Sequence, residues 1–270
     1  ATHANGLHAT LPGIRNALEV RAGTSGLSPA LEKGFRNHCS ACHASCGDCH
    51  IAVPEEAGSG LLMGHFPQKT PPATFTCTAC HGSRVNMEFK GKNSGIPADV
   101  HYGLDMTCTD CHKAAEMHGA GSKTANHRYQ VTDAPRCATC HPDDDAFKAI
   151  AAHKPHRTGA GGALDLSCQA CHAVRYKNCR DCHLKLGEGD VPTFEVNPPD
   201  HVSQMALRIG RNPMKDALHP ETWVPVRHAP SSPTSFAFYG EDLLPAYDAA
   251  PTWHLATPHT IRRTTPQNKD

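Results

Sequence analysis

One short pattern, Cys-x-x-Cys-His, recurs seven times in this chain and uses all 14 of its cysteines. The cysteine pairs are Cys39 and Cys42, Cys46 and Cys49, Cys77 and Cys80, Cys108 and Cys111, Cys137 and Cys140, Cys168 and Cys171, and Cys179 and Cys182. The histidines that follow are His43, His50, His81, His112, His141, His172 and His183. With 21 histidines in 270 residues, a histidine would follow any given Cys-x-x-Cys pair by chance roughly 8% of the time, so it would follow all seven pairs on the order of once in 10⁷ to 10⁸ cases.

Cys-x-x-Cys-His is the attachment pattern of c-type haem, in which two thiols bond to the porphyrin and the adjacent imidazole becomes an axial ligand of iron. We therefore expect seven covalently bound haem c groups, with the motif histidines as proximal ligands. Structural zinc is one alternative, because paired Cys-x-x-Cys units also form tetrahedral sites. A disulfide framework is another. Neither alternative explains why a histidine follows every pair.

The composition is unsuited to a conventional apolar core. Hydrophobic residues make up 39% of the chain and aromatic residues 6%, while glycine and proline supply 22 residues each. Residues 38–183 provide about 21 residues per motif, too few to wrap each porphyrin in its own protein layer. We therefore predict a multihaem cytochrome c fold that is mostly coil, with a few short α-helices, little or no sheet, and a core formed by stacked haems.

The cysteines divide the chain into three regions. Residues 1–37 form an N-terminal arm, residues 38–183 form a heptahaem region, and residues 184–270 form a Cys-free, proline-rich extension suited to contact another subunit. Motifs one and two, and likewise motifs six and seven, are joined by such short segments that we expect the porphyrins of each couple to touch.

Two helices are predicted from local signals. Ser28 can cap a helix that begins at Pro29, with Leu31 and Phe35 on one face. A second helix is predicted over residues 143–154, with acidic residues at its start and Pro155 at its end.

Fourteen histidines lie outside the motifs, twice the number needed to give each iron a second imidazole. The stronger candidates for distal ligands lie between motifs: His65, His101, His118, His127, His153 and His156. His38, His201, His219 and His228 are candidates for the remaining positions. His3 and His8 in the arm have no clear partner within the chain, and we expect them to reach a haem of a neighbouring subunit. Methionine is a competing ligand, but the six Met residues stand in no suggestive context.

Four segments of the chain resemble the motifs of secreted multihaem cytochromes of bacteria and archaea: HCSACHASCGDCH, TCTACHGSRV, MTCTDCH and CQACHAVRYKNCRDCH. The likeness runs through most of the chain. These proteins pass electrons to minerals, electrodes or other cells. The resemblance implies closely paired haems, redox-partner cytochromes and an extracellular electron acceptor. Cytochrome filaments are related to these proteins by function, and in them the subunits stack so that the haem row is continuous. The resemblance therefore implies that further copies of this chain are its partners. A soluble shuttle is the alternative.

The expected location follows from the cofactor. Haem of this type is attached outside the cytoplasmic membrane, so we expect a secreted, extracellular protein whose signal peptide has been removed, with a periplasmic location as the alternative. The formal net charge is zero, which gives no reason to expect nucleic acid as a partner, and no apolar run is long enough to predict a membrane span. The last twenty residues resemble stretches that lead into a further motif, so we expect the gene to continue past Asp270 or the product to be processed there.

An enzyme acting on small nitrogen or sulfur compounds is the competing function. Such enzymes need one iron with a vacant face, and some mark it with Cys-x-x-Cys-Lys or a haem-linked tyrosine. No Cys-x-x-Cys-Lys occurs here. Tyr102, Tyr129 and Tyr176 are present, but a lone tyrosine more often packs or donates a hydrogen bond. We therefore predict no catalytic residue.

Carbon monoxide tests this prediction. Two axial imidazoles leave iron no open position, so carbon monoxide added to the reduced protein should leave its visible spectrum unchanged. A spectral shift corresponding to one haem in seven would instead favour the enzyme.

Overall fold

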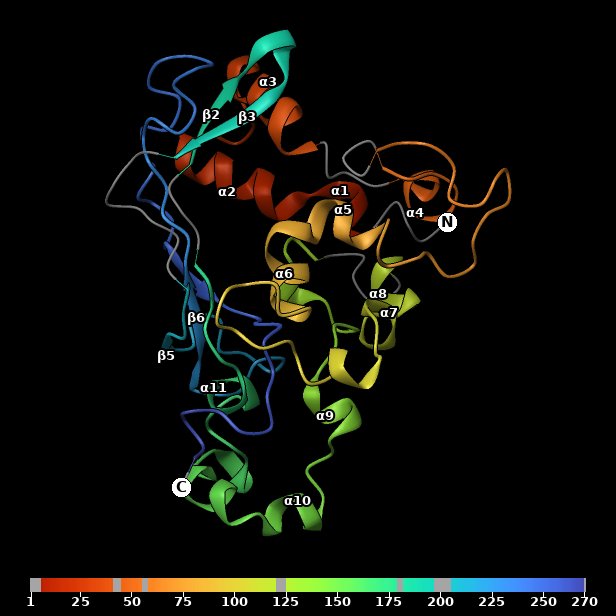
Figure 1. Cartoon of the computed structure of the whole chain (residues 1–270). Helices are drawn as coiled ribbons and strands as arrows, with labels where there is room; N and C mark the ends of the chain where they lie inside the picture. The colour runs from red at the N-terminus through yellow and green to blue at the C-terminus, as the bar shows by residue number, and fades with distance from the viewer. Residues whose placement is uncertain are drawn as a thin grey trace.

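The computed structural model describes residues 6–40, 45–54, 58–119, 125–178, 182–196 and 205–269. Short helices are joined by long loops, and the described strands form three small antiparallel sheets. In Figure 1, β5 and β6 run down the left of the view, and the helices α4, α7 and α9 lie to their right.

The helices and strands are short. The α-helices are α1 (Leu7–Thr10), α2 (Pro12–Ala22), α3 (Pro29–His38), α4 (Cys46–His50), α5 (Cys77–His81), α6 (Met87–Phe89), α7 (Cys108–Cys111), α8 (Ala114–Met117), α9 (Cys137–Cys140), α10 (Asp145–Ala149) and α11 (Cys168–His172). The strands are β1 (Tyr176–Lys177), β2 (Cys182–Leu186), β3 (Pro192–Val196), β4 (Met205–Ala206), β5 (Ile209–Arg211), β6 (Trp223–His228) and β7 (Trp253–Leu255). They pair as β1–β4, β2–β3 and β5–β6–β7.

Each of the five completely described motifs begins a helix at its first cysteine, in α4, α5, α7, α9 and α11. A helical turn puts the two cysteines, three residues apart, on one face. Capping boxes support two of these helices: Ser45 with Asp48, and Thr107 with Asp110. Helices of four or five residues do not persist alone in water. The positions of the motifs therefore depend on contacts with the rest of the chain.

The helix predicted after Ser28 is confirmed. The amide of Leu31 donates to the Ser28 hydroxyl at 3.3 Å, and α3 begins at Pro29. Leu31 and Phe35 are both buried on its inner face.

The helix predicted over residues 143–154 is shorter than expected. Asp144 caps α10, which ends at Ala149, because Ile150 adopts an extended conformation. Residues 151–156 continue as a 3₁₀ segment that contains Pro155. Proline cannot supply the amide that an α-helix needs at this point. The break turns His153 back toward Phe147, with a ring-centroid separation of 4.4 Å.

The clusters of buried apolar side chains lie outside the motif region, where buried apolar residues such as Ile96, Val131 and Tyr176 belong to neither cluster. One cluster joins the arm to the C-terminal region: Leu18, Leu31, Phe35, Leu184, Phe236 and Leu244. The other consists of Val224, Val226 and Leu255 on β6 and β7. Both clusters of buried apolar side chains found in the described ranges are therefore built by the two ends of the chain.

The sheets lie mainly in the C-terminal region, where the composition led us to expect little regular structure. In β6, Val224 and Val226 point into the second cluster, as the two-residue period of a strand allows. Across the described part of the chain, no helix has the length and apolar character needed to cross a membrane.

Gly34 in α3 tests how tightly the arm packs on the C-terminal region. A Cβ at this position would lie 2.8 Å and 2.9 Å from ring carbons of Phe236 and 3.1 Å from Tyr239. Because Phe236 is buried, its ring has little room to move. We expect Gly34→Ala to destabilise the protein by about 1–3 kcal/mol, seen as a lower Tm in thermal unfolding followed by circular dichroism.

Gly103→Ala is the matched control. A Cβ at Gly103 meets no atom within 4 Å, so the change in stability should stay within about 0.5 kcal/mol. Equal Tm values for the two variants would contradict the packing described for Gly34.

Candidate functional site

The motif histidines meet histidines from outside the motifs. Each histidine of the five completely described motifs has one such partner. The ring-centroid separations are 6.1 Å for His81 and His8, 6.0 Å for His50 and His118, 6.3 Å for His141 and His101, 6.4 Å for His112 and His259, and 6.3 Å for His172 and His153. The partners come from sequence positions both before and after their motifs.

The separation is nearly constant although the ring orientation is not. The interplanar angles of the five pairs range from 21° to 85°. Most other ring contacts of histidine are closer, such as 4.8 Å between His228 and Trp253 and 5.3 Å between His38 and Phe194, although the rings of His219 and Tyr129 also lie 6.1 Å apart. Two imidazole nitrogens bound on opposite sides of one metal ion at about 2.0 Å each would hold their ring centroids about 6.3 Å apart. The five pairs therefore have the spacing of two axial ligands with a metal between them.

Several of these rings are held through Nδ1. The Nδ1 atoms of His50 and His172 donate to the carbonyl oxygens of Gln68 at 2.5 Å and Arg262 at 3.1 Å. His183, the last motif histidine, donates in the same way to Thr234 at 3.1 Å. Histidine ligands of metals usually donate their second ring nitrogen to such an acceptor, which leaves Nε2 for the metal.

Carboxylates orient two more of the rings. Glu116 accepts from Nδ1 of His112 at 2.9 Å, and Asp99 accepts from Nδ1 of His101 at 2.8 Å. The hydrogen bond to Glu116 raises the pKa of His112. A carboxylate in this position fixes the ring orientation and makes Nε2 more basic.

Two partner histidines contain a buried ring nitrogen whose bonding capacity is unused. The Nδ1 atoms of His153 and His259 are buried without a hydrogen-bond partner. Burial lowers the pKa of His259 to about 3, so this ring is neutral at pH 7. A neutral imidazole is the form that binds metal ions.

The cysteines show how the motifs follow one another in space. Hydrogen bonds join Cys77 to Cys108, and Cys137 to Cys168. These bonds lower the pKa of Cys108 to about 6 and that of Cys137 to about 7. Motif three therefore touches motif four, and motif five touches motif six. None of the cysteine side chains that the structure describes forms a disulfide.

The couples that we expected from short tethers involve residues only partly described. Cys42, His43 and Cys179 lie outside the described residues, and the structure describes only the backbone of Cys182. The couples formed by motifs one and two and by motifs six and seven therefore remain predictions.

Three of the ten predicted distal ligands face a motif histidine: His101, His118 and His153. Two others, His127 and His219, lie on either side of Tyr129, with ring-centroid separations of 5.7 Å and 6.1 Å.

The remaining candidates have other surroundings. Nε2 of His38 lies 2.9 Å from the hydroxyl of Tyr239, and the ring of His228 lies beside Trp253. His65 is exposed and His156 is half-buried. His201 lies outside the described residues, as does His3 of the arm.

Two partner histidines were not among the ten candidates. His259 had no predicted role, and it faces His112. His8 was expected to reach a neighbouring subunit, but it lies opposite His81 of its own chain, because α1 and α2 bring the arm back against the motifs. No local sequence signal marks either residue, since each meets its motif through contacts between distant parts of the chain.

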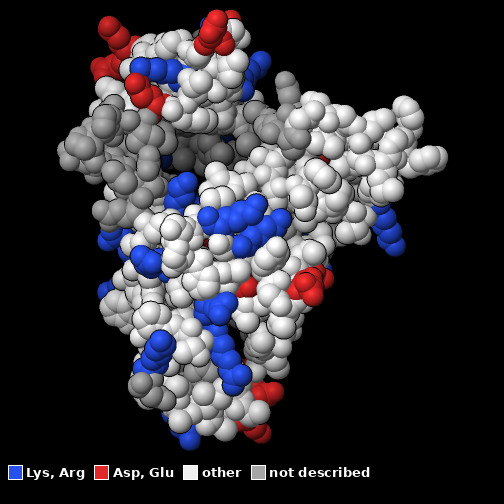
Figure 2. Space-filling view, in the orientation of Figure 1, with Lys and Arg blue, Asp and Glu red and all other residues white. Residues whose placement is uncertain are grey.

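Charge is unevenly distributed over the surface. In Figure 2, Lys and Arg side chains predominate over the middle of the face shown, whereas Asp and Glu gather near its upper end. Near the paired histidines, the positive charges of Arg84 and Arg128 add to burial in lowering the pKa of His81. Such a field favours a ligand that carries negative charge.

Comparison with known proteins does not assign this site to a family. No protein-family model, no curated protein and no solved structure matches the chain. Over the described ranges, His, Cys, Asp and Glu side chains form no group of three or more placed to hold a metal ion.

Proposed function

We propose that this chain is a multihaem c-type cytochrome that transfers electrons through a row of seven covalently bound haems. The observation that carries the proposal is the pairing of every completely described motif histidine with a second histidine at 6.0–6.4 Å. Bound haem supplies a one-electron iron couple.

The protein's own residues provide attachment, ligation and orientation. Each motif turn presents two thiols on one face that would hold the haem, and its histidine and the partner histidine would serve as the ligands of the iron. Acceptors such as Gln68 and Glu116 hold the motif rings in place. With the iron held by imidazole from both histidines of a pair, such a site would exchange electrons without binding substrate.

Two further observations support haem. Within the described residues, the motif region contributes no cluster of buried apolar side chains. A large apolar group such as haem would supply the apolar contacts that this region lacks. The positive charge near His81 suits the two carboxylates that each haem carries.

The contacts between cysteines support a continuous electron path. Motif three touches motif four through Cys77 and Cys108, and motif five touches motif six through Cys137 and Cys168. Burial raises the pKa of Cys111, and the proximity of Cys140 adds to that change, so motif five lies near motif four. Haems attached at these cysteines would therefore lie next to one another in the order in which their motifs occur in the sequence.

Covalent attachment gives the first test. Thioether bonds survive unfolding, so intact-mass spectrometry of the denatured protein should find the chain plus seven haems, and its pyridine haemochrome should match that number. A chain that loses its metal on denaturation and carries no haem would be a zinc protein instead.

The histidine pairing gives a second test. In His259→Ala, the iron held by His112 loses its second ligand, so carbon monoxide should bind about one haem in seven of the reduced protein. Glu188→Ala is the control, because Glu188 is exposed and cannot ligate haem iron in place of histidine, so it should leave the spectrum unchanged. Equal carbon monoxide binding by the two variants would contradict the assignment of His259.

For the biological setting, we propose a secreted subunit of an extracellular filament, with a periplasmic or soluble shuttle as the alternative. The segment between α4 and α5 extends away from the rest of the chain in Figure 1 and exposes Leu61, Met63 and Phe66. Such a group of exposed apolar side chains favours contact with another protein surface, and further copies of the chain are the partner proposed here.

Electron microscopy tests the filament. Negatively stained protein at near-native concentration should show uniform thin filaments, and Phe66→Glu should shorten or abolish them because it puts a charge into the contact. Small uniform particles from the unsubstituted protein would favour the shuttle.

A further inference from the structure

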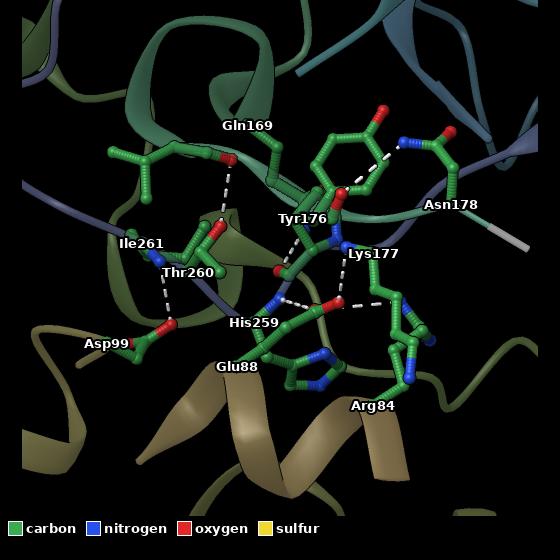
Figure 3. Close-up of polar contacts among 12 residues, drawn as sticks. Arg84, Glu88, Asp99, Gln169, Tyr176, Lys177, Asn178, His259, Thr260 and Ile261 are labelled. Carbon is green, nitrogen blue, oxygen red and sulfur yellow. Dashed lines mark hydrogen bonds and ion pairs between the residues drawn. The ribbon is translucent and has the colours of Figure 1, made fainter. Parts of the chain in front are cut away.

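A buried carboxylate holds the segment that contains His259. Glu88 of α6 has no exposed surface. Its Oε1 accepts from the amide of Lys177, and its Oε2 accepts from the amide of His259, both at 3.2 Å. Arg84 lies 3.6 Å from Oε2. Figure 3 shows these groups converging on the Glu88 carboxylate.

A second buried carboxylate connects the same segment to another partner histidine. One oxygen of Asp99 accepts from both the amide and Nδ1 of His101, at 2.9 Å and 2.8 Å. Its other oxygen accepts from the amide of Ile261 at 2.9 Å. Asp99 therefore joins His101, which faces His141, to the segment that holds His259.

Backbone contacts fasten the segment on both sides. Thr260, which is fully buried, exchanges two hydrogen bonds with Val174 at 3.1 Å each. Ile261 accepts from the amide of Val100 at 2.8 Å. Arg262 donates to the carbonyl of His172 at 2.7 Å and accepts from Nδ1 of its ring. Residues 259–262 thus connect the motif histidines His112 and His172.

We propose that Glu88 and Asp99 are positioning residues that hold residues 259–262 in place, so that His259 and His101 stand opposite the irons bound by His112 and His141. This inference rests on the proposed function. Neither carboxylate touches a motif histidine in the described contacts, and each acts through the backbone or ring of a partner histidine.

The carboxylate form is essential to this role. Three donors face the oxygens of Glu88 and three face those of Asp99. Replacing the carboxylate by an amide keeps the shape of the side chain but turns one of its two acceptor oxygens into an N–H donor. That donor would then face the N–H group of a neighbouring residue. Buried donors without acceptors would then favour displacement of the segment.

Glu88→Gln is the main test. We expect the reduced variant to bind carbon monoxide at up to one haem in seven, above the level of the unsubstituted protein, with all seven haems retained. Adding Glu88→Gln to His259→Ala should cause no further increase, because both changes act on the same iron. Asp99→Asn added to His259→Ala should cause an increase, because it also releases His101.

Glu188→Gln is the matched control, because this exposed glutamate lies outside the contacts described above, and it should leave carbon monoxide binding unchanged. A Glu88→Gln variant with seven haems and no carbon monoxide binding beyond that of the unsubstituted protein would overturn the inference while the proposed function stands. A chain without covalent haem would overturn the proposed function itself.

Hydrogen exchange tests the inference without any substitution. The amides of His259 and Ile261 donate to buried carboxylates, so in the haem-loaded protein they should exchange as slowly as the amides of α11. Rapid exchange over residues 259–262 would show that the segment is not held and would overturn the inference.

Discussion

The pairing of motif histidines with histidines from elsewhere in the chain is the constraint on which the rest of the structure depends. The motif turns are only four or five residues long and have no independent stability. In the proposed cytochrome, the partner histidine and the segment that delivers it would locate them. Those segments come from the arm, from the loops between motifs and from the C-terminal region, so each pair joins parts of the chain that are distant in sequence.

Around the segment that contains His259, buried polar contacts hold the chain in place, as apolar packing does in the cores of other proteins. Glu88, Asp99 and Thr260 are all buried, and each either lies on the segment that contains His259 or accepts a hydrogen bond from it. Burying a carboxylate is costly unless its oxygens are satisfied, and backbone amides satisfy both of these carboxylates. Burial raises the pKa of Glu88, and the charge of Arg84 opposes that change. Because these bonds are directional, they set the position of a ligand more closely than apolar packing would.

The two ends of the chain form a common support for the motifs. Leu18, Leu31 and Phe35 of the arm pack with Leu184, Phe236 and Leu244 of the C-terminal region, and each end also delivers a partner histidine, His8 or His259. In the proposed cytochrome, ligation of the central motifs and folding of the flanking regions would therefore be coupled. In the proposed cytochrome, this coupling would fix the spacing of successive haems, on which electron transfer between them depends.

The sequence by itself determined the seven Cys-x-x-Cys-His motifs, because cysteine spacing and the adjacent histidine are local features that a single helical turn carries. It also determined α3, whose cap at Ser28 lies within the same few residues. It did not determine where α10 ends or which histidines become partners: His101, His118 and His153 were predicted, whereas His8 and His259 were not. Partner choice was decided only by the tertiary structure, because it depends on hydrogen bonds from Glu88 and Asp99 and on packing between the chain's two ends, neither of which leaves a periodic or local pattern in the sequence.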